Sequence, residues 1–264
     1  MIINDSFVNT NEYNSNNKLD TTIIITHGLA EYSKSYINAA LAFEKAGFNV
    51  ITYDLRGHGK TRGKRGYVKS YKDFVNDLDT LVKYAYKETN YVYLIGHSMG
   101  GVITNIYTAI NNSVDGVIIT ASPTNFLKEL NLLRFVPKFI TNGIKVKTNF
   151  KDATMSSINN YQKDAYDLNY FYFKIINETM FKGMKVLRKN LDNYDTPILM
   201  IYSKSDKAVG VEQATHFLSK IPVADQKLLV YEDSYHNLFV DIEFDKLIND
   251  ITEWIKERIN LKAR

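Results

Sequence analysis

Short apolar runs alternate with longer amphipathic stretches along most of the chain. The runs are β-branched or aromatic without alternating polarity, which is typical of strands covered on both faces. They predict strands at 22–26, 49–53, 91–95, 116–120, 198–202 and 227–231. The stretches between them have helical spacing and predict helices at 34–46, 71–87, 99–110, 211–219 and 239–258. This βαβα order predicts a doubly wound, mostly parallel α/β sheet with right-handed crossovers.

The alternation stops between Thr124 and Asn193, where the pattern is helical and contains no convincing strand. An insertion of this size between two sheet strands is expected to form a cap over the carboxyl edge of the sheet, where open α/β sheets bind their ligands. We therefore expect a single domain over residues 1–264, with a cap insertion at approximately 124–193, before the last two strands.

Composition excludes several kinds of site. A chain of 264 residues can bury one large core, and the absence of cysteine excludes disulfides, a thiolate nucleophile and cysteine metal sites. No apolar run is long enough to span a membrane, and the N-terminus has no basic start followed by an apolar run. We expect a cytoplasmic protein without a metal or an organic cofactor. The sequence does not indicate an oligomeric state.

The segment Tyr93 to Gly101 (YLIGHSMGG) holds the clearest chemical motif. Gly96-His97-Ser98-Met99-Gly100 matches Gly-x-Ser-x-Gly, in which a sharp strand-to-helix turn exposes a strained serine. A predicted strand precedes the motif and a predicted helix follows it, as this turn requires. The alternative is a glycine-rich turn with an incidental serine. We predict that Ser98 is a nucleophile.

A serine nucleophile needs a base and an acid that orients the base. His236 lies in a loop just after the last predicted strand, whereas His216 lies within a predicted helix on a solvated face. Asp206 follows the preceding strand, which gives the order Ser98, Asp206, His236 expected for this arrangement. Two alternatives remain: Asp206 could cap the next helix, and Asp233 could be the acid.

The intermediate of acyl transfer also needs two donors for its oxyanion. The backbone N–H of Met99 follows the nucleophile directly. The loop after the first predicted strand, where Gly28 permits close approach of the backbone, supplies the N–H of Leu29.

Two other sequence features suggest binding sites that the surrounding residues do not support. Gly59-Lys60-Thr61 resembles the end of a phosphate-binding loop, but Asp54 stands where the first glycine is required. The basic residues of the same region could suggest nucleic acid, but no aromatic interleaving accompanies them, and we expect a solvated loop and no nucleic-acid partner. These residues are Arg56, Lys60, Arg62, Lys64 and Arg65.

Together, five segments resemble the monoacylglycerol lipase and lysophospholipase-like branch of the α/β-hydrolases. They are His27 to Glu31 (HGLAE), Tyr53 to Gly59 (YDLRGHG), Gly96 to Gly101 (GHSMGG), Ser205-Asp206 and Tyr231 to His236 (YEDSYH). The resemblance implies a Ser98, Asp206, His236 triad and oxyanion donors at Leu29 and Met99. The sequence departs from these lipases at Asp233, where a glycine is common, so we expect an extra charge near the base.

The charge of the predicted cap bears on the substrate. Residues 124–193 contain 12 Lys/Arg and 6 Asp/Glu, whereas the net charge of the whole chain is only +4. The cap also holds many apolar residues, which either pack in the core or form an acyl-chain tunnel or a lipid-facing surface. We predict a serine hydrolase acting on monoacylglycerol or lysophospholipid, with membrane contact through cap residues such as Lys128, Leu130, Leu133, Arg134, Phe135 and Lys138.

Alternatives remain within and outside this enzyme class. The chain could be a broad carboxylesterase, thioesterase or peptidase acting on small soluble substrates, or a ligand-binding protein of the same fold with little turnover. An aminopeptidase would need carboxylates for the substrate amine, and the cap has few.

Overall fold

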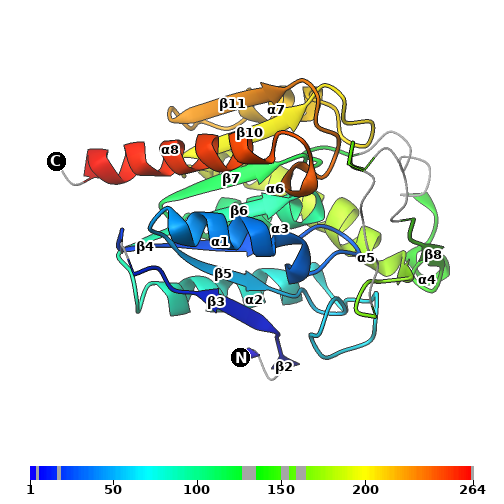
Figure 1. Cartoon of the computed structure of the whole chain (residues 1–264). Helices are drawn as coiled ribbons and strands as arrows, with labels where there is room; N and C mark the ends of the chain where they lie inside the picture. The colour runs from blue at the N-terminus through cyan, green and yellow to red at the C-terminus, as the bar shows by residue number, and fades with distance from the viewer. Residues whose placement is uncertain (4–5, 17–18, 127–134, 150–154, 159–164, 263–264) are drawn as a thin grey trace.

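A twisted, mostly parallel sheet forms the centre of the computed structural model, which describes residues 1–3, 6–16, 19–126, 135–149, 155–158 and 165–262 (Figure 1). Within these residues its strand order is β11-β10-β7-β6-β4-β5-β3, and only the β3–β5 pair is antiparallel. The predicted fold class is confirmed. The strands are β3 (Thr10–Tyr13), β4 (Thr21–Thr26), β5 (Asn49–Tyr53), β6 (Tyr91–His97), β7 (Gly116–Thr120), β10 (Ile198–Ser203) and β11 (Gln226–Tyr231).

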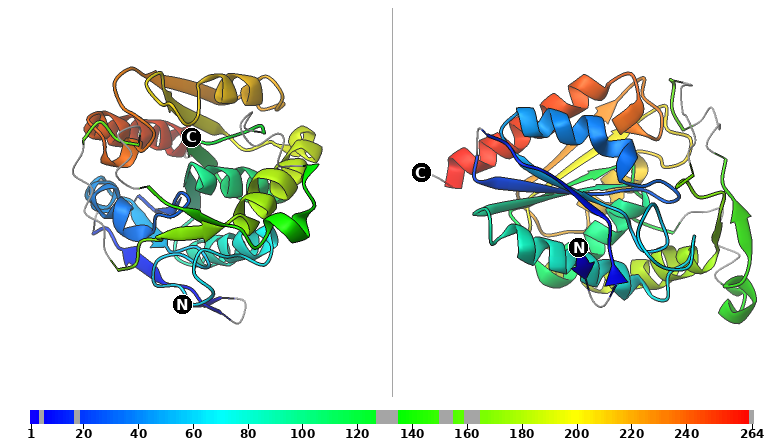
Figure 2. Two further views of the ribbon diagram at one scale, coloured as in Figure 1. Left: turned by 90° about the vertical axis from the view of Figure 1, so that its right-hand side faces the viewer. Right: turned by 60° about the horizontal axis from the view of Figure 1, so that its bottom comes forward.

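Helices cover both faces of the sheet, which is why its strands are apolar throughout (Figures 1 and 2). Ile23 and Ile95 point into the core beneath α1 (Ile37–Lys45) and α8 (Phe244–Lys262). Ile24 and Leu94 point into the core on the opposite face. That face is covered by α2 (Tyr71–Ala85), α3 (Met99–Asn111) and α7 (Glu212–Leu218), and the short η1 (Ser33–Tyr36) precedes α1.

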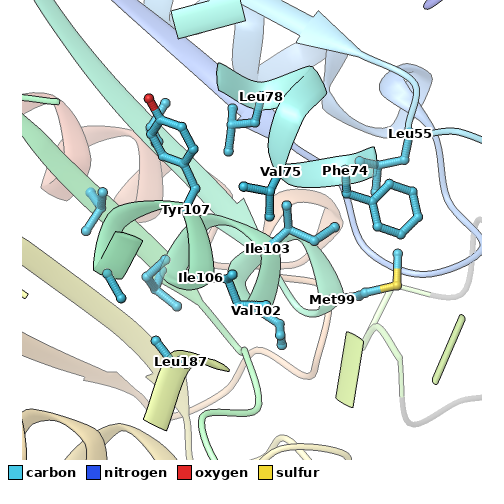
Figure 3. Close-up of a cluster of buried hydrophobic side chains, with 14 of the residues drawn as sticks. Leu55, Phe74, Val75, Leu78, Met99, Val102, Ile103, Ile106, Tyr107 and Leu187 are labelled. Atoms are coloured by element: carbon cyan, nitrogen blue, oxygen red, sulfur yellow. The ribbon is translucent and has the colours of Figure 1, made fainter. Parts of the chain in front are cut away.

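The end of the insertion belongs to the same core. It consists of α5 (Lys174–Ile176), the π-helical η4 (Asn177–Gly183) and α6 (Met184–Lys189). Both η4 and α6 pack against α3, and η4 also contacts α2. Leu187 lies close to Ile106 and Val102 of α3 (Figure 3). Each such side chain, when fully buried, contributes about 1.5–3 kcal/mol. Core packing, the alternative to an acyl-chain tunnel, therefore accounts for Ile175, Met180 and Phe181.

The earlier part of the insertion contains two strands that the sequence did not predict. They are β8 (Lys145–Lys147) and β9 (Tyr170–Tyr172), which pair antiparallel after α4 (Lys138–Thr141), while η5 (Leu191–Asn193) ends the segment. Both strands are very short and their partners are distant in sequence, so no local pattern reveals them. Also missed were β3, which pairs with the distant β5, and the two-residue strands β1 (Ile2–Ile3) and β2 (Ser6–Phe7), which pair with each other and are too short to show a pattern. The limits of the cap, 124–193, stay a prediction.

The basic loop after β5 contacts the insertion. Lys60 and Lys64 are exposed, as expected, but aromatic rings lie against them. Lys64 Nζ lies 4.1 Å from the centre of the Tyr172 ring, and Lys60 Nζ lies 5.1 Å from that of Tyr166. The Tyr172 N–H also donates to Gly66 O at 2.7 Å. The Tyr166 and Tyr172 rings come from a segment about a hundred residues later in the chain, while the Tyr67 ring, 4.7 Å from Lys64 Nζ, belongs to the same loop. That no nucleic acid binds here stays a prediction.

Candidate active site

Ser98 sits in a strained turn between β6 and α3. Its φ of 50° and ψ of −121° lie outside the regions favoured by residues with a Cβ. The flanking glycines make this turn feasible. A Cβ at Gly96 would lie 2.6 Å from Thr104 Oγ1, and one at Gly100 would lie 2.6 Å from His27 O. The turn predicted from the sequence is present, and Ser98 is only partly buried whereas the residues on both sides are buried.

The structure brings the predicted nucleophile, base and acid together. His236 Nε2 lies 3.0 Å from Ser98 Oγ, and His236 Nδ1 lies 2.9 Å from Asp206 Oδ2. A ring that donates from Nδ1 to the carboxylate keeps Nε2 free to accept the serine proton. The His236 and Asp206 side chains are almost fully buried, at 5% and 0% exposed. This geometry suits a serine whose hydroxyl is activated by a histidine.

Asp206 is held in place by its own loop. Its Oδ1 accepts the backbone N–H groups of the residues two and three positions later, at 2.7 and 3.0 Å. It does not cap α7, because Val211 occupies the cap position of that helix. The rival acid Asp233 is exposed, and its backbone N–H donates to Glu243. The contact with His236 is made by Asp206.

The peptide unit between Gly28 and Leu29 is oriented by His27. The Leu55 N–H donates to His27 Nε2 at 2.9 Å, so the ring proton is on Nδ1 and donates to Gly28 O at 2.7 Å. Carbonyl and N–H point in opposite directions in a trans peptide, so this bond also fixes the direction of the Leu29 N–H. Burial lowers the pKa of His27 to about 4, which keeps the ring neutral at pH 7.

The same loop lies against the nucleophile. A Cβ at Gly28 would be 3.3 Å from Ser98 Cβ, so the Leu29 backbone begins next to the serine. Met99 is the first residue of α3, where the helix leaves its N–H groups without helical partners. Within the part of the chain that the structure describes, neither the Leu29 nor the Met99 N–H donates to another protein group. The oxyanion role of these two groups stays a prediction.

A second buried histidine lies beside the base. The His97 ring centre is 5.1 Å from that of His236, and His97 Nδ1 lies 3.0 Å from Thr120 Oγ1. Burial, together with the nearby His236, lowers the pKa of His97 well below its ordinary value, so His97 does not compete for the serine proton. His216 is exposed on α7, as expected.

Sequence reasoning gave no role to two further polar residues at the site. Glu31 belongs to the HGLAE segment that carried the family resemblance, and Asn237 follows the base directly. Their side chains are hydrogen-bonded to each other, which joins the loop after β4 to the loop after β11. Both loops lie at the carboxyl edge of the parallel sheet, but the contact between these two side chains depends on loop conformation, which neither segment alone indicates.

Comparisons with known proteins agree with this geometry. A family model described as Serine aminopeptidase, S33 matches residues 17–243. The chain belongs to this family. A monoglyceride lipase of Saccharomyces cerevisiae is 26% identical over 283 residues, which cover 95% of this chain and 89% of that protein. The crystal structure of a Paleococcus ferrophilus monoacylglycerol lipase matches with a TM-score of 0.83 at 21% identity, covering 96% of this chain and 99% of that one.

One relative is much longer than this chain. An uncharacterized abhydrolase domain-containing protein of Dictyostelium discoideum is 27% identical over 90% of this chain, which spans only 26% of that protein. Taken together, the matches confirm the α/β-hydrolase fold and the resemblance to monoacylglycerol lipases. Among the described residues, no helix has both the length and the apolar character needed to cross a bilayer. The described residues also contain no group of three or more His, Asp or Glu that could hold a metal ion.

Proposed function

We propose that the chain is a serine esterase that hydrolyses single-chain lipid esters, either monoacylglycerols or lysophospholipids, through an acyl-enzyme. The observation that carries the proposal is the hydrogen-bonded series from Ser98 Oγ through His236 to Asp206, at 3.0 and 2.9 Å. The similarity to monoglyceride lipases supports the substrate class.

The proposed reaction has two halves. Ser98 Oγ attacks the ester carbonyl carbon while its proton moves to His236 Nε2, and the N–H groups of Leu29 and Met99 stabilise the resulting oxyanion. When the tetrahedral intermediate breaks its bond to the leaving alcohol, His236 returns the proton to the alcohol oxygen. Water then attacks the acyl carbon while His236 takes its proton. The bond to Ser98 Oγ breaks, His236 returns that proton to Oγ, and the fatty acid is released. Asp206 holds the imidazole and stabilises its charged form.

The insertion supplies a second element of the proposal, which is docking on an anionic lipid surface. In α4 and the turn after it, Phe139, Ile140 and Ile144 are 83%, 53% and 47% exposed. Lys138 directly precedes Phe139, and its pKa is lowered mainly by burial and further by the nearby lysines. Apolar side chains with cations around them match the chemistry of an anionic membrane surface. Of the residues that carried the original expectation, Lys128, Leu130, Leu133 and Arg134 lie outside the described part of the chain.

Fluorophosphonate labelling and a substrate panel test the proposed function. We expect labelling on Ser98, none in Ser98→Ala, and faster hydrolysis of monoacylglycerols or lysophospholipids than of short p-nitrophenyl esters. The family description makes an aminopeptidase the main competitor, so the panel includes amino-acid p-nitroanilides. Preferred cleavage of those amides, or a Ser98 that does not label, contradicts the proposal; the second outcome would favour a binding protein.

A further inference from the structure

The Glu31 carboxylate is the meeting point of three segments. Its Oε2 accepts the Gly28 N–H at 3.1 Å and the Tyr36 hydroxyl at 2.8 Å, and its Oε1 accepts the Asn237 side-chain amide. One donor lies in the loop after β4, one at the end of η1, and one directly after His236. The Gly28 N–H and the Asn237 NH₂ can only donate, and the Tyr36 hydroxyl donates here as well, an arrangement that suits an ionised carboxylate.

Each of these bonds acts on a group that the proposed reaction needs. The bond to the Gly28 N–H fixes the peptide unit before Gly28, while His27 fixes the one after it through Gly28 O. Both sides of Gly28 are thereby restrained, and the direction of the Leu29 N–H depends on them. The bond to Asn237 restrains the residue that follows the base, whose backbone N–H donates to Met155 O at 2.8 Å.

The charge of Glu31 also reaches the base. Burial raises the pKa of Glu31, and the hydrogen bonds from Tyr36 and Gly28 and the positive charge of His236 oppose that rise. By reciprocity, ionised Glu31 favours the imidazolium that forms when Ser98 loses its proton. Among the described groups that face His236, Asp206 is hydrogen-bonded to Nδ1 and His97 is held neutral by burial. Asp167 opposes ionisation of Glu31 from the side of the insertion.

Resting on the proposed esterase function, we infer that Glu31 is a positioning residue that couples the oxyanion loop to the base loop. Its hydrogen bonds go to Gly28, Tyr36 and Asn237, all outside the triad. Its carboxylate sets the direction of one oxyanion donor through Gly28 and restrains the loop of His236 through Asn237, and its charge favours the imidazolium. A glutamine replaces one accepting oxygen by an NH₂ group and removes the charge, so the bond to Asn237 survives only if the Asn237 amide turns its Oδ1 toward it.

The test compares Glu31→Gln with Glu232→Gln in the full chain. Glu232 is a matched control, because it follows β11 but its side chain is 62% exposed and pairs with Lys204. With p-nitrophenyl butyrate, Glu31→Gln should lower kcat by about 10- to 100-fold while KM changes by less than about threefold. The acid limb of the kcat/KM profile should move to lower pH, because the imidazolium loses a nearby negative charge. Glu232→Gln should match the wild type in kcat and in the position of the acid limb.

Three outcomes separate the explanations. If the wild type is active and Glu31→Gln changes neither kcat nor the acid limb, the inference about Glu31 is wrong and the proposed esterase function still stands. Should Glu31→Gln fail to fold, Asn237→Ala decides: a loss in kcat of about 3- to 10-fold supports the coupling, and an unchanged kcat overturns it. A wild type that neither turns over nor labels at Ser98 contradicts the proposed function instead.

Discussion

At the scale of single residues, three side chains that follow different strands are joined by hydrogen bonds and form one proposed catalytic unit. Because Ser98, His236 and Asp206 act together, Ser98→Ala, His236→Ala and Asp206→Asn should each lower kcat by roughly 10⁴- to 10⁶-fold. The double variant Ser98→Ala/His236→Ala should be little worse than either single one. Steady-state hydrolysis of a chromogenic ester measures all four variants. Near-normal turnover in Asp206→Asn would remove that residue from the acid role.

Asp233 provides a second residue-scale prediction. The sequence suggested an extra charge near the base, but the Asp233 side chain is exposed, and solvent screens an exposed charge. We therefore expect Asp233→Gly to leave the pH profile of kcat/KM unchanged, in contrast to Glu31→Gln. A shift of the acid limb in Asp233→Gly at low salt that vanishes at high salt would show that its charge does reach His236.

The contrast between these two carboxylates shows what the sequence can predict about the site. The triad could be found from the sequence because each member follows a strand, and the carboxyl ends of parallel strands meet at one edge of a sheet. Glu31 could not be assigned in this way, since its partners depend on side-chain directions in loops. Position along the chain made Asp233 look close to His236, but neighbouring residues in a loop often face opposite ways.

At the scale of elements, the predicted strands and helices of the central layers match the observed ones within a few residues, the start of α8 excepted. Those elements carry their own pattern, because burial on both faces requires continuous apolar strands. The strands that were missed, β1, β2, β3, β8 and β9, are short, and the last three of them pair with segments distant in the sequence. The π-helical η4 was also missed, because a change of helical pitch leaves no simple periodicity.

Glu178 tests the stability of that π-helical element. Its side chain is 1% exposed and accepts Lys174 at 2.9 Å and Lys182 at 2.6 Å, and its second oxygen accepts the Tyr71 N–H at the start of α2. Glu178→Gln loses charge-assisted bonds in a buried place and should lower the free energy of unfolding by about 1–3 kcal/mol. Urea denaturation measures the change.

The control for Glu178 is an exposed pair with the same spacing. Lys83 and Asp79 are 2.7 Å apart on α2, with 73% and 29% of their side chains exposed. Asp79→Asn should change the free energy of unfolding by less than about 0.5 kcal/mol. Equal effects of the two substitutions would mean that Glu178 contributes no more than a surface pair.

For the whole molecule, the buried histidines predict a loss of stability in acid. Burial lowers the pKa of His27 to about 4 and of His58 to about 3, and it lowers that of His97 well below the ordinary value. Each pKa is lower when folded than when unfolded, so unfolding takes up protons once the pH falls below about 6.5. At pH 5 each buried histidine lowers the free energy of unfolding by roughly 2 kcal/mol.

Urea denaturation between pH 7.5 and 5 checks this acid prediction. Replacement of His58, whose Nε2 is buried without a hydrogen-bond partner among the described residues, should make the loss shallower. His216→Gln should leave it unchanged, since His216 is exposed on α7. Stability that stays constant over this range would mean that the buried rings become protonated in the folded protein.

The position of the insertion relative to the sheet gives the last prediction, which concerns lipid docking. Lys138 directly precedes the exposed Phe139 and Ile140, and the exposed Lys145 and Lys147 lie in the next strand, β8, whereas the triad is built on the ends of sheet strands. Each basic residue near an anionic surface contributes about 1 kcal/mol, so reversing all three charges should weaken vesicle binding by at least roughly 100-fold. Hydrolysis of vesicle-borne substrate should slow, and hydrolysis of a short soluble ester should hardly change.

Two comparisons separate docking from a structural effect. Reversal of three exposed lysines outside the insertion, Lys45, Lys87 and Lys220, makes the same change in net charge and should leave vesicle binding much less affected. High salt should weaken binding by the wild type, because charge attraction is screened within about 8 Å at physiological ionic strength, while the apolar contribution of Phe139 persists. Equal loss on vesicle and soluble substrates would mean that these lysines support the fold of the insertion. No loss on either substrate would contradict docking through α4.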